Sequence, residues 1–180
     1  MIKMNAGQLR KVSREEIDSS AQKKQDIYII LDDVLDTYNI GSIFRLADAV
    51  AAKKVILCGR TTIPPNPRIK KASINTTEVV EWEYAPTAVG AIKNLKFKIK
   101  NLSVVAVEQS KKAVPYDQFE YRLPLCLIVG HESEGVSEDV LRIVDATLEI
   151  PMFGVNVSLN VMASLGIVLY KVLEKLQSNS

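Results

Sequence analysis

Short apolar runs rich in β-branched residues recur along the chain, with helical segments between them. Each run has four or five residues, which suits a buried strand. The runs are Ile27–Leu31, Val55–Cys58, Ser103–Val107, Leu125–Val129 and Ala146–Ile150. Strands that alternate with helices predict an α/β fold, with a mainly parallel sheet flanked by helices.

Helical spacing appears between the runs. It predicts helices over Ile40–Ala52 and Thr87–Lys100, a short helix capped by Ser137, and a last helix over Asn156–Leu176. The last helix is apolar around nearly its whole circumference, so every side of it must be buried. It therefore either threads the core or forms a subunit interface, and we favour a homodimer through this helix.

Composition narrows the class of protein. A chain of 180 residues that is 47% hydrophobic and 24% charged is one globular domain, not a disordered or fibrous chain. We divide it into a short basic extension, residues 1–24, and a main domain, residues 25–180.

No apolar run reaches the length of a membrane span. Cys58 and Cys126 are isolated from each other and His131 is the one histidine, so we expect free thiols, no metal site and a cytoplasmic location.

Charge is unevenly distributed along the chain. Residues 1–112 hold 19 bases and 12 acids, whereas residues 113–180 hold 4 bases and 9 acids. Residues 51–77 contain six bases and no acid. Part of this stretch is rich in proline, which predicts a long basic loop that contacts the phosphates of RNA or DNA. The candidate residues for this contact are Arg60, Arg68, Lys70 and Lys71. A second cluster, Lys93, Lys96, Lys98 and Lys100, is interpreted as solvated surface.

The common nucleotide-binding fingerprints are missing. The sequence has no G-x-G-x-x-G after its first strand and no G-x-x-x-x-G-K-[ST], which argues against Rossmann and P-loop enzymes. It also lacks the G-x-S-x-G elbow of the α/β-hydrolases. Three other segments with glycine and asparagine stand at predicted strand ends, where open α/β sheets bind ligands. They begin at Asn39, Gly130 and Ile150.

Together the three segments resemble the SpoU family of RNA 2′-O-methyltransferases, in the SPOUT superfamily. Asn39, Gly41 and Arg45 match the family's N-x-G-x-x-x-R motif. A second motif, G-x-E-x-x-G, is matched by Gly130, Glu132 and Gly135, and a third, I-P-M-x-G-x-x-x-S-L-N-V, is matched in full over residues 150–161. The resemblance covers roughly residues 26–175.

This resemblance implies a fold whose C-terminal part is tied in a deep trefoil knot, although knots are rare in proteins. It implies S-adenosylmethionine as cofactor, bound by Val107, Glu108, Gly130, Ile150, Met152 and Leu159. It also implies a homodimer with the active site near the interface. The implied catalytic residues are Arg45, Asn39, Glu132, Ser158 and Asn160.

Several roles stay open at this point. The family's arginine is assigned to deprotonating the ribose hydroxyl, but a guanidinium holds its proton, so Arg45 either acts as a base or stabilises the alkoxide. Asn39 either orients Arg45 or the ribose, or caps a helix. Glu132 either accepts backbone N–H bonds or holds Arg45. Ser158 is a candidate helix cap, and Asn160 is expected to reach the cofactor loop or the substrate.

The leading hypothesis is an RNA ribose methyltransferase. We favour tRNA over ribosomal RNA, because the chain has little beyond a catalytic core and a short basic extension. Two alternatives remain from the sequence alone: a knotted RNA-binding protein without activity, and a small-molecule methyltransferase without an RNA partner. The intact motifs argue against the first, and the acid-free stretch argues against the second.

Overall fold

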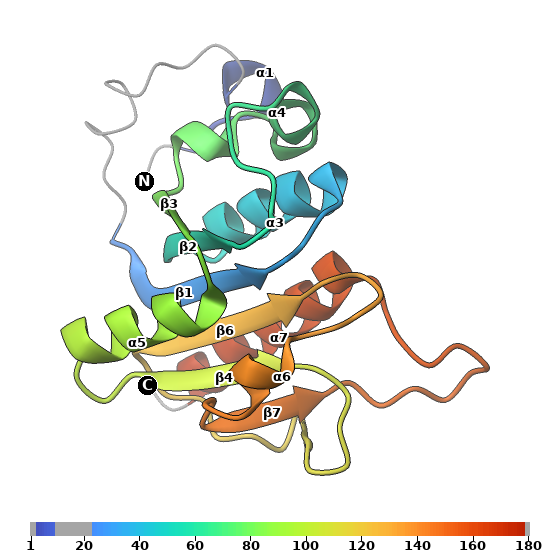
Figure 1. Cartoon of the computed structure of the whole chain (residues 1–180). Coiled ribbons are helices and arrows are strands. Elements are labelled where there is room, and N and C mark those ends of the chain that lie inside the picture. Colours follow the sequence, from blue (N-terminus) through green and yellow to red (C-terminus); the bar gives the residue numbers. More distant parts are fainter. Residues whose placement is uncertain (1–2, 10–22, 179–180) are drawn as a thin grey trace.

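The computed structural model describes residues 3–9 and 23–178. Its centre is a seven-stranded sheet in the order β3-β2-β1-β6-β4-β7-β5, in which every pair of neighbours is parallel (Figure 1). This confirms the predicted α/β class. The strands are β1 Gln25–Asp32, β2 Ala52–Cys58, β3 Trp82–Ala85, β4 Ser103–Val107, β5 Val114–Pro115, β6 Leu125–Gly130 and β7 Ala146–Glu149.

Helices cover both faces of the sheet (Figure 1). They are α1 Ala6–Leu9, α3 Thr37–Ala49, α4 Pro67–Ser73, the 3-10 helix η1 Thr76–Glu78, α5 Ala88–Lys98, α6 Glu138–Leu141 and α7 Val161–Ser178. Alternate residues of β1 point to opposite faces. Ile27, Ile29 and Leu31 join the core under α3 and α7, whereas Tyr28 and Ile30 join the core under α5 and α6.

Two strands were missed by the sequence patterns. β3 reads Trp-Glu-Tyr-Ala, so a glutamate interrupts its apolar residues and they form no apolar run. β5 is two residues long. Both lie at the edges of the sheet, where a strand is less buried and needs no continuous apolar sequence.

The stretch predicted as a long basic loop contains a helix. Arg68, Lys70 and Lys71 lie on α4, so the expectation of a loop is wrong at these positions. Asn66 begins the helix, because its side chain accepts the N–H groups of Arg68 at 2.9 Å and Ile69 at 3.2 Å. Pro67 takes the first helical position, where the missing N–H costs no hydrogen bond. Proline here starts a helix instead of preventing one.

The last helix does not thread the core. α7 begins at Val161, five residues later than predicted, and buries Leu165, Val168, Leu169 and Val172. Ile167 and Tyr170 on its other side are exposed, so α7 packs on the sheet through one face only. The alternative, a subunit interface, stays a prediction. Among the described residues, no helix combines the length and apolarity needed to cross a membrane.

The predicted basic extension falls largely outside the described residues, which omit 1–2 and 10–22. Its described part contains α1, whose last residue contacts the main domain. Asn75 donates its side-chain N–H to the carbonyl of Leu9 at 3.0 Å.

Candidate active site

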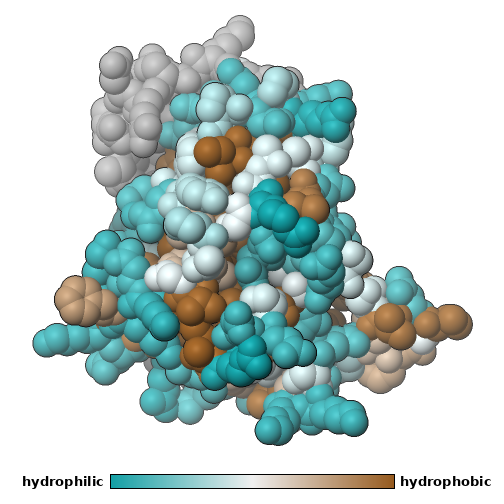
Figure 2. Space-filling view, viewed as in Figure 1, coloured by the Kyte–Doolittle hydropathy of each residue, from teal (hydrophilic) through white to brown (hydrophobic). Residues whose placement is uncertain are grey.

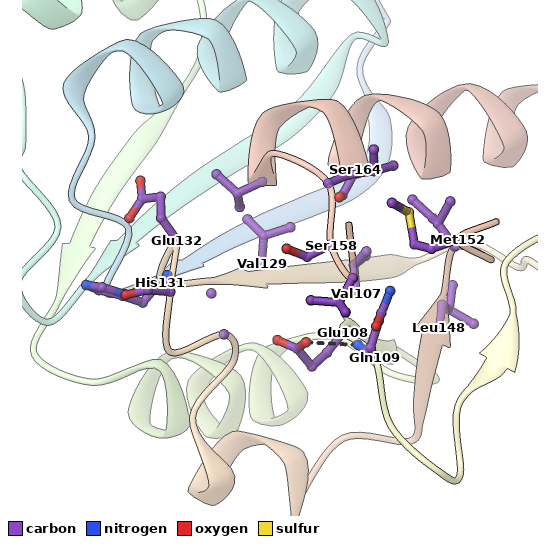
Figure 3. A pocket seen from close by; sticks show the side chains of 17 residues that line it. Val107, Glu108, Gln109, Val129, His131, Glu132, Leu148, Met152, Ser158 and Ser164 are labelled. Atoms are coloured by element: carbon purple, nitrogen blue, oxygen red, sulfur yellow. Dashed lines mark hydrogen bonds between the residues drawn. The ribbon is translucent and has the colours of Figure 1, made fainter. Parts of the chain in front are cut away.

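A cavity of about 290 Å³ opens where β4, β6 and β7 end (Figure 3). Its lining combines the residues after these strands with the segment that leads into α7. Val107, Leu148, Ile150, Met152 and Val161 are among its apolar residues, and Glu108, Gln109, Ser158 and Ser164 are among its polar ones. The structure brings all the predicted cofactor-binding residues to this one cavity: Val107, Glu108, Gly130, Ile150, Met152 and Leu159.

The loop after β6 is a tight hairpin that forms one wall of the cavity. His131 and Gly135 exchange backbone hydrogen bonds of 3.0 and 2.9 Å. The backbones of Gly130 and Gly135 are in close contact, since a Cβ on Gly130 would stand 2.2 Å from the backbone of Gly135. Gly135 also has a φ of +72°, which favours glycine. The second motif therefore needs both glycines for steric reasons.

Carboxylates from the two neighbouring strands hold the end of this loop. Glu108, directly after β4, accepts the N–H of Val136 at 2.8 Å and that of Gln109 at 2.8 Å. Asp32, the last residue of β1, accepts the N–H of Ser137 at 2.9 Å. Glu108 thus supports the loop as well as lining the cavity.

Glu132 binds the loop to the start of α3. It accepts the backbone N–H groups of Leu35 at 3.1 Å and Asp36 at 2.9 Å, and a side-chain N–H of Asn39 at 3.0 Å. Partial burial acts to raise the pKa of Glu132, but the hydrogen bonds from Asn39, Asp36 and Leu35 outweigh it and hold this pKa below its ordinary value. Glu132 is therefore an ionised acceptor. It accepts backbone N–H bonds, which is the first alternative expected for it, and among the described residues no hydrogen bond or ion pair joins it to Arg45.

Asn39 and Asn160 extend this network to the third motif. Asn160 donates from Nδ2 to Asn39 Oδ1 at 3.0 Å, and its own Oδ1 accepts the N–H groups of Met162 at 3.0 Å and Ala163 at 3.3 Å. Asn160 is thus the residue that caps α7. A chain of hydrogen bonds Glu132–Asn39–Asn160 joins the three motifs.

Two expected helix caps are wrong. Asn39 lies inside α3, and Asp36 caps that helix by accepting the N–H of Tyr38 at 2.7 Å. Ser158 does not cap α7, because two residues separate it from the first helical position. It lies in the irregular segment before α7 and lines the cavity. Ser137 does precede α6, but its side chain makes no capping hydrogen bond.

Arg45 lies apart from this network. It stands on the exposed side of α3 and does not line the cavity. Six helical positions separate it from Asn39, which turns it about 240° around the axis. Within residues 3–9 and 23–178 its guanidinium has no hydrogen bond or ion pair, so it is available to a group from outside.

The sequence matches the SpoU rRNA Methylase family over residues 26–170. The chain belongs to this family. Among curated relatives it is 31% identical over 154 residues to the tRNA (guanosine(18)-2′-O)-methyltransferase of Aquifex aeolicus, covering 83% of this chain and 70% of that protein. It is 27% identical to the enzyme of the same name from Escherichia coli K12, covering 84% of this chain and 64% of that protein. Membership confirms the resemblance and the class of enzyme expected from the motifs.

Solved structures of SpoU proteins share the fold. The A. aeolicus TrmH/SpoU tRNA modifying enzyme has a TM-score of 0.78 at 25% identity, covering 97% of this chain and 83% of that chain. The SpoU methyltransferase AviRb from Streptomyces viridochromogenes, solved in complex with AdoMet, has a TM-score of 0.79 at 22% identity. The match covers 89% of this chain and 64% of that chain.

The candidate RNA-binding residues of this SpoU protein occupy two different environments. Arg60 follows β2, and its guanidinium lies 3.3 Å from both Asp33 and Glu134. The backbone N–H of Arg60 and its side chain hold the pKa of Asp33 below its ordinary value. Arg68, Lys70 and Lys71 are exposed on α4 and have no acidic partner in the described part of the chain.

Some residues of the site were missed by sequence reasoning. Asp36 carries a recognisable signal, since an aspartate directly before a helical segment is a common cap. Asp32 stands at the end of an apolar run, where ligand-binding and supporting residues gather. Gln109 and Ser164 line the cavity without any sequence pattern that marks them.

Proposed function

We propose that this chain transfers a methyl group from S-adenosylmethionine to a ribose 2′-hydroxyl of tRNA. One observation carries the proposal: residues of all three SpoU motifs meet in the Glu132–Asn39–Asn160 chain beside a cavity at the strand ends. The two curated relatives described above are named for ribose 2′-O-methylation of guanosine in tRNA, which supports both the reaction and the substrate.

The cavity fits the chemistry of the proposed cofactor. Adenine and the methionine chain need apolar walls, and the ribose and amino groups need acceptors. Leu148, Ile150 and Val161 supply apolar surface, while Glu108 and Ser158 supply oxygen atoms. Gly130 lines the cavity at the end of β6, where its lack of a side chain lets the backbone of Gly135 pack against it. When bound, the cofactor supplies a methyl group on a sulfonium, which makes alignment the main task of the protein.

Arg45 is the residue we propose to act on the ribose. The hydroxyl becomes a stronger nucleophile as its proton leaves, and a cation beside it stabilises the developing alkoxide. Glu132 is poorly suited to take that proton, because its carboxylate already accepts three hydrogen bonds and its pKa is lowered. We assign Glu132, Asn39 and Asn160 to positioning, because hydrogen bonds join the three, and Ser158 to the cavity that it lines. No metal is required, because the sulfonium is already activated.

A homodimer through α7 is part of the proposal. The segment between β7 and α7 projects from the domain and carries apolar side chains at its end (Figure 2). Phe153 is 97% exposed there, and Ile167 and Tyr170 extend the apolar surface along α7. A second copy would cover these groups and bring its surface towards the exposed Arg45.

Three further features complete the proposal. The trefoil knot is supported by the family and by the likeness to SpoU structures.

We propose that α4 contacts RNA through Arg68, Lys70 and Lys71, and that Arg60 adds a contact beside them. The extension over residues 1–24 adds positive charge to the RNA-binding surface. A tRNA substrate favours a cytoplasmic protein.

Labelled S-adenosylmethionine tests this proposal. The protein is incubated with total RNA from a strain that lacks the gene, and the RNA is then separated by size. We expect label in the tRNA fraction. Label in the large ribosomal RNA would keep the reaction and overturn the substrate. RNA binding without any transfer would indicate a binding protein, and cofactor binding without RNA binding would indicate a small-molecule enzyme.

A further inference from the structure

The outer side of α5 carries an exposed aromatic ring among lysines. Phe97 is 90% exposed, although phenylalanine has no polar atom to favour that position. Lys93 lies one helical turn before it, and Lys98 and Lys100 follow it. All three lysines are exposed. We call Lys93, Phe97, Lys98 and Lys100 the α5 surface.

Little negative charge opposes these lysines. Residues 84–107 contain four lysines and no acid. Lys96 pairs with Asp145 at 2.7 Å, but the three lysines of the α5 surface have no ion pair within the described ranges. The helix dipole accounts for lysines in the last turn. It accounts neither for Lys100, which lies beyond the helix, nor for the exposed ring.

This surface lies at the opposite end of the strands from the cavity. α5 runs into β4, so the end of α5 lies where the parallel strands begin, whereas the cavity lies where they end. Figure 1 shows the end of α5 and the projecting segment before α7 on opposite sides of the domain. Hydrophilic side chains gather around that end of α5 in Figure 2. The α5 surface is therefore separate from the proposed active site.

We propose that the α5 surface is a second RNA contact, which binds the substrate away from the methylated nucleotide. Phe97 stacks on an unpaired base, and the lysines contact the adjoining phosphates. A nucleotide offers a flat π-face and an anion in one unit, which matches an aromatic ring beside unpaired cations. An acidic peptide would match the lysines only. This inference rests on the proposed function, and it is an alternative to the interpretation of the lysine cluster as solvated surface.

Substitutions on the α5 surface test this proposal, with binding measured on unmodified tRNA transcripts at several salt concentrations. Phe97→Ala is expected to weaken binding about fivefold or more, since the stacking of one base on an aromatic ring contributes affinity of that order. Phe97→Trp keeps an aromatic ring and is expected to bind like the original protein. Lys93→Ala with Lys98→Ala should flatten the dependence of log Kd on log salt by about 0.7 for each phosphate that the protein no longer neutralises. Cofactor affinity should not change.

Lys53→Ala with Lys54→Ala is the matched control. It removes two positive charges, as the double lysine variant of the α5 surface does. Asp26, Glu81 and Glu83 already pair with Lys53 and Lys54, so we expect little change in tRNA binding. A short RNA hairpin that carries the methylation site provides the second control. Its length is chosen so that it cannot span from the cavity to the α5 surface, and the α5 variants should then methylate it like the original protein.

The outcomes separate the two proposals. If the original protein methylates tRNA and the α5 variants bind tRNA with unchanged affinity and salt dependence, the second RNA contact is wrong and the proposed function stands. An equal loss of methylation on tRNA and on the hairpin would also contradict it, because the surface would then act near the methylated nucleotide. A protein that methylates no RNA would overturn the function itself.

Discussion

Asn160 donates a hydrogen bond of 3.0 Å to Asn39, across a separation of 121 residues. Chemistry fixes the direction of this bond. The ionised Glu132 only accepts, so Asn39 turns its NH₂ to Glu132 and its carbonyl to Asn160. Asn160 then turns its own NH₂ to Asn39, which leaves its carbonyl to cap α7. One orientation of both amides satisfies every partner.

A double-mutant cycle measures this coupling. Asn39→Ala and Asn160→Ala are each expected to lower the free energy of unfolding, with Asn160→Ala the more costly because it also removes a helix cap. The double variant should be destabilised by about 1 kcal/mol less than the sum of the two single variants, since the shared bond is removed only once. Urea unfolding of the four proteins gives the values. Strict additivity would show that the bond contributes nothing.

Glu132→Gln tests the carboxylate through pH. Because the folded pKa of Glu132 is lowered, its contribution to stability is fully present above the ordinary carboxyl pKa of about 4.3 and is lost as pH falls through the folded value. Glu132→Gln should therefore have a free energy of unfolding about 1 kcal/mol lower than that of the original protein near neutral pH. This difference should become smaller as the pH falls. Unfolding curves at several pH values check this. A gap that stays constant with pH would contradict the assigned charge.

The two glycines of the second motif should resist substitution. Gly135→Ala places a Cβ 2.2 Å from Glu108 at a φ of +72°, and Gly130→Ala places one 2.2 Å from the backbone of Gly135. Each should destabilise the fold by about 1–3 kcal/mol. Gly154→Ala is the control, because nothing lies within 4 Å of its Cβ. Thermal unfolding ranks the three, and a comparable destabilisation at Gly154 would undermine the steric account.

The thiols should be inert in the folded protein. Cys58 and Cys126 are both buried and unpaired. Burial raises the pKa of the Cys58 thiol to about 12 and also raises that of Cys126. A thiol reagent at pH 8 should label both only after unfolding. Rapid labelling of the native protein would show that these strands open.

Much of the fold follows from local pattern. The apolar runs correspond to β1, β2, β4, β6 and β7 because buried parallel strands need continuous apolar sequence. β3 and β5 lie at edges and escape that rule. The start of α4 depends on Asn66 as a cap and on Pro67 at the first helical position, although the prolines had suggested a loop.

The site was only partly predictable. The second and third motifs marked many of the residues that line the cavity, because glycines and amides at strand ends are visible in sequence. They could not show which residue contacts which. The bond between Asn39 and Asn160 depends on how α3 and α7 pack, and the separation of Arg45 from Glu132 depends on the turn of α3. The first relation arises from tertiary packing, and the second combines helix geometry with the packing of the loop after β6 on α3.

The position of the transferred methyl group tests the central claim most directly. A 2′-O-methyl group removes the hydroxyl that attacks the neighbouring phosphodiester, so alkali leaves the modified site uncut. We predict that tRNA treated with the protein and labelled S-adenosylmethionine yields an alkali-resistant labelled dinucleotide, and that Arg45→Ala yields almost none. Label on a base, no label at all, or near-normal transfer by Arg45→Ala would contradict the account.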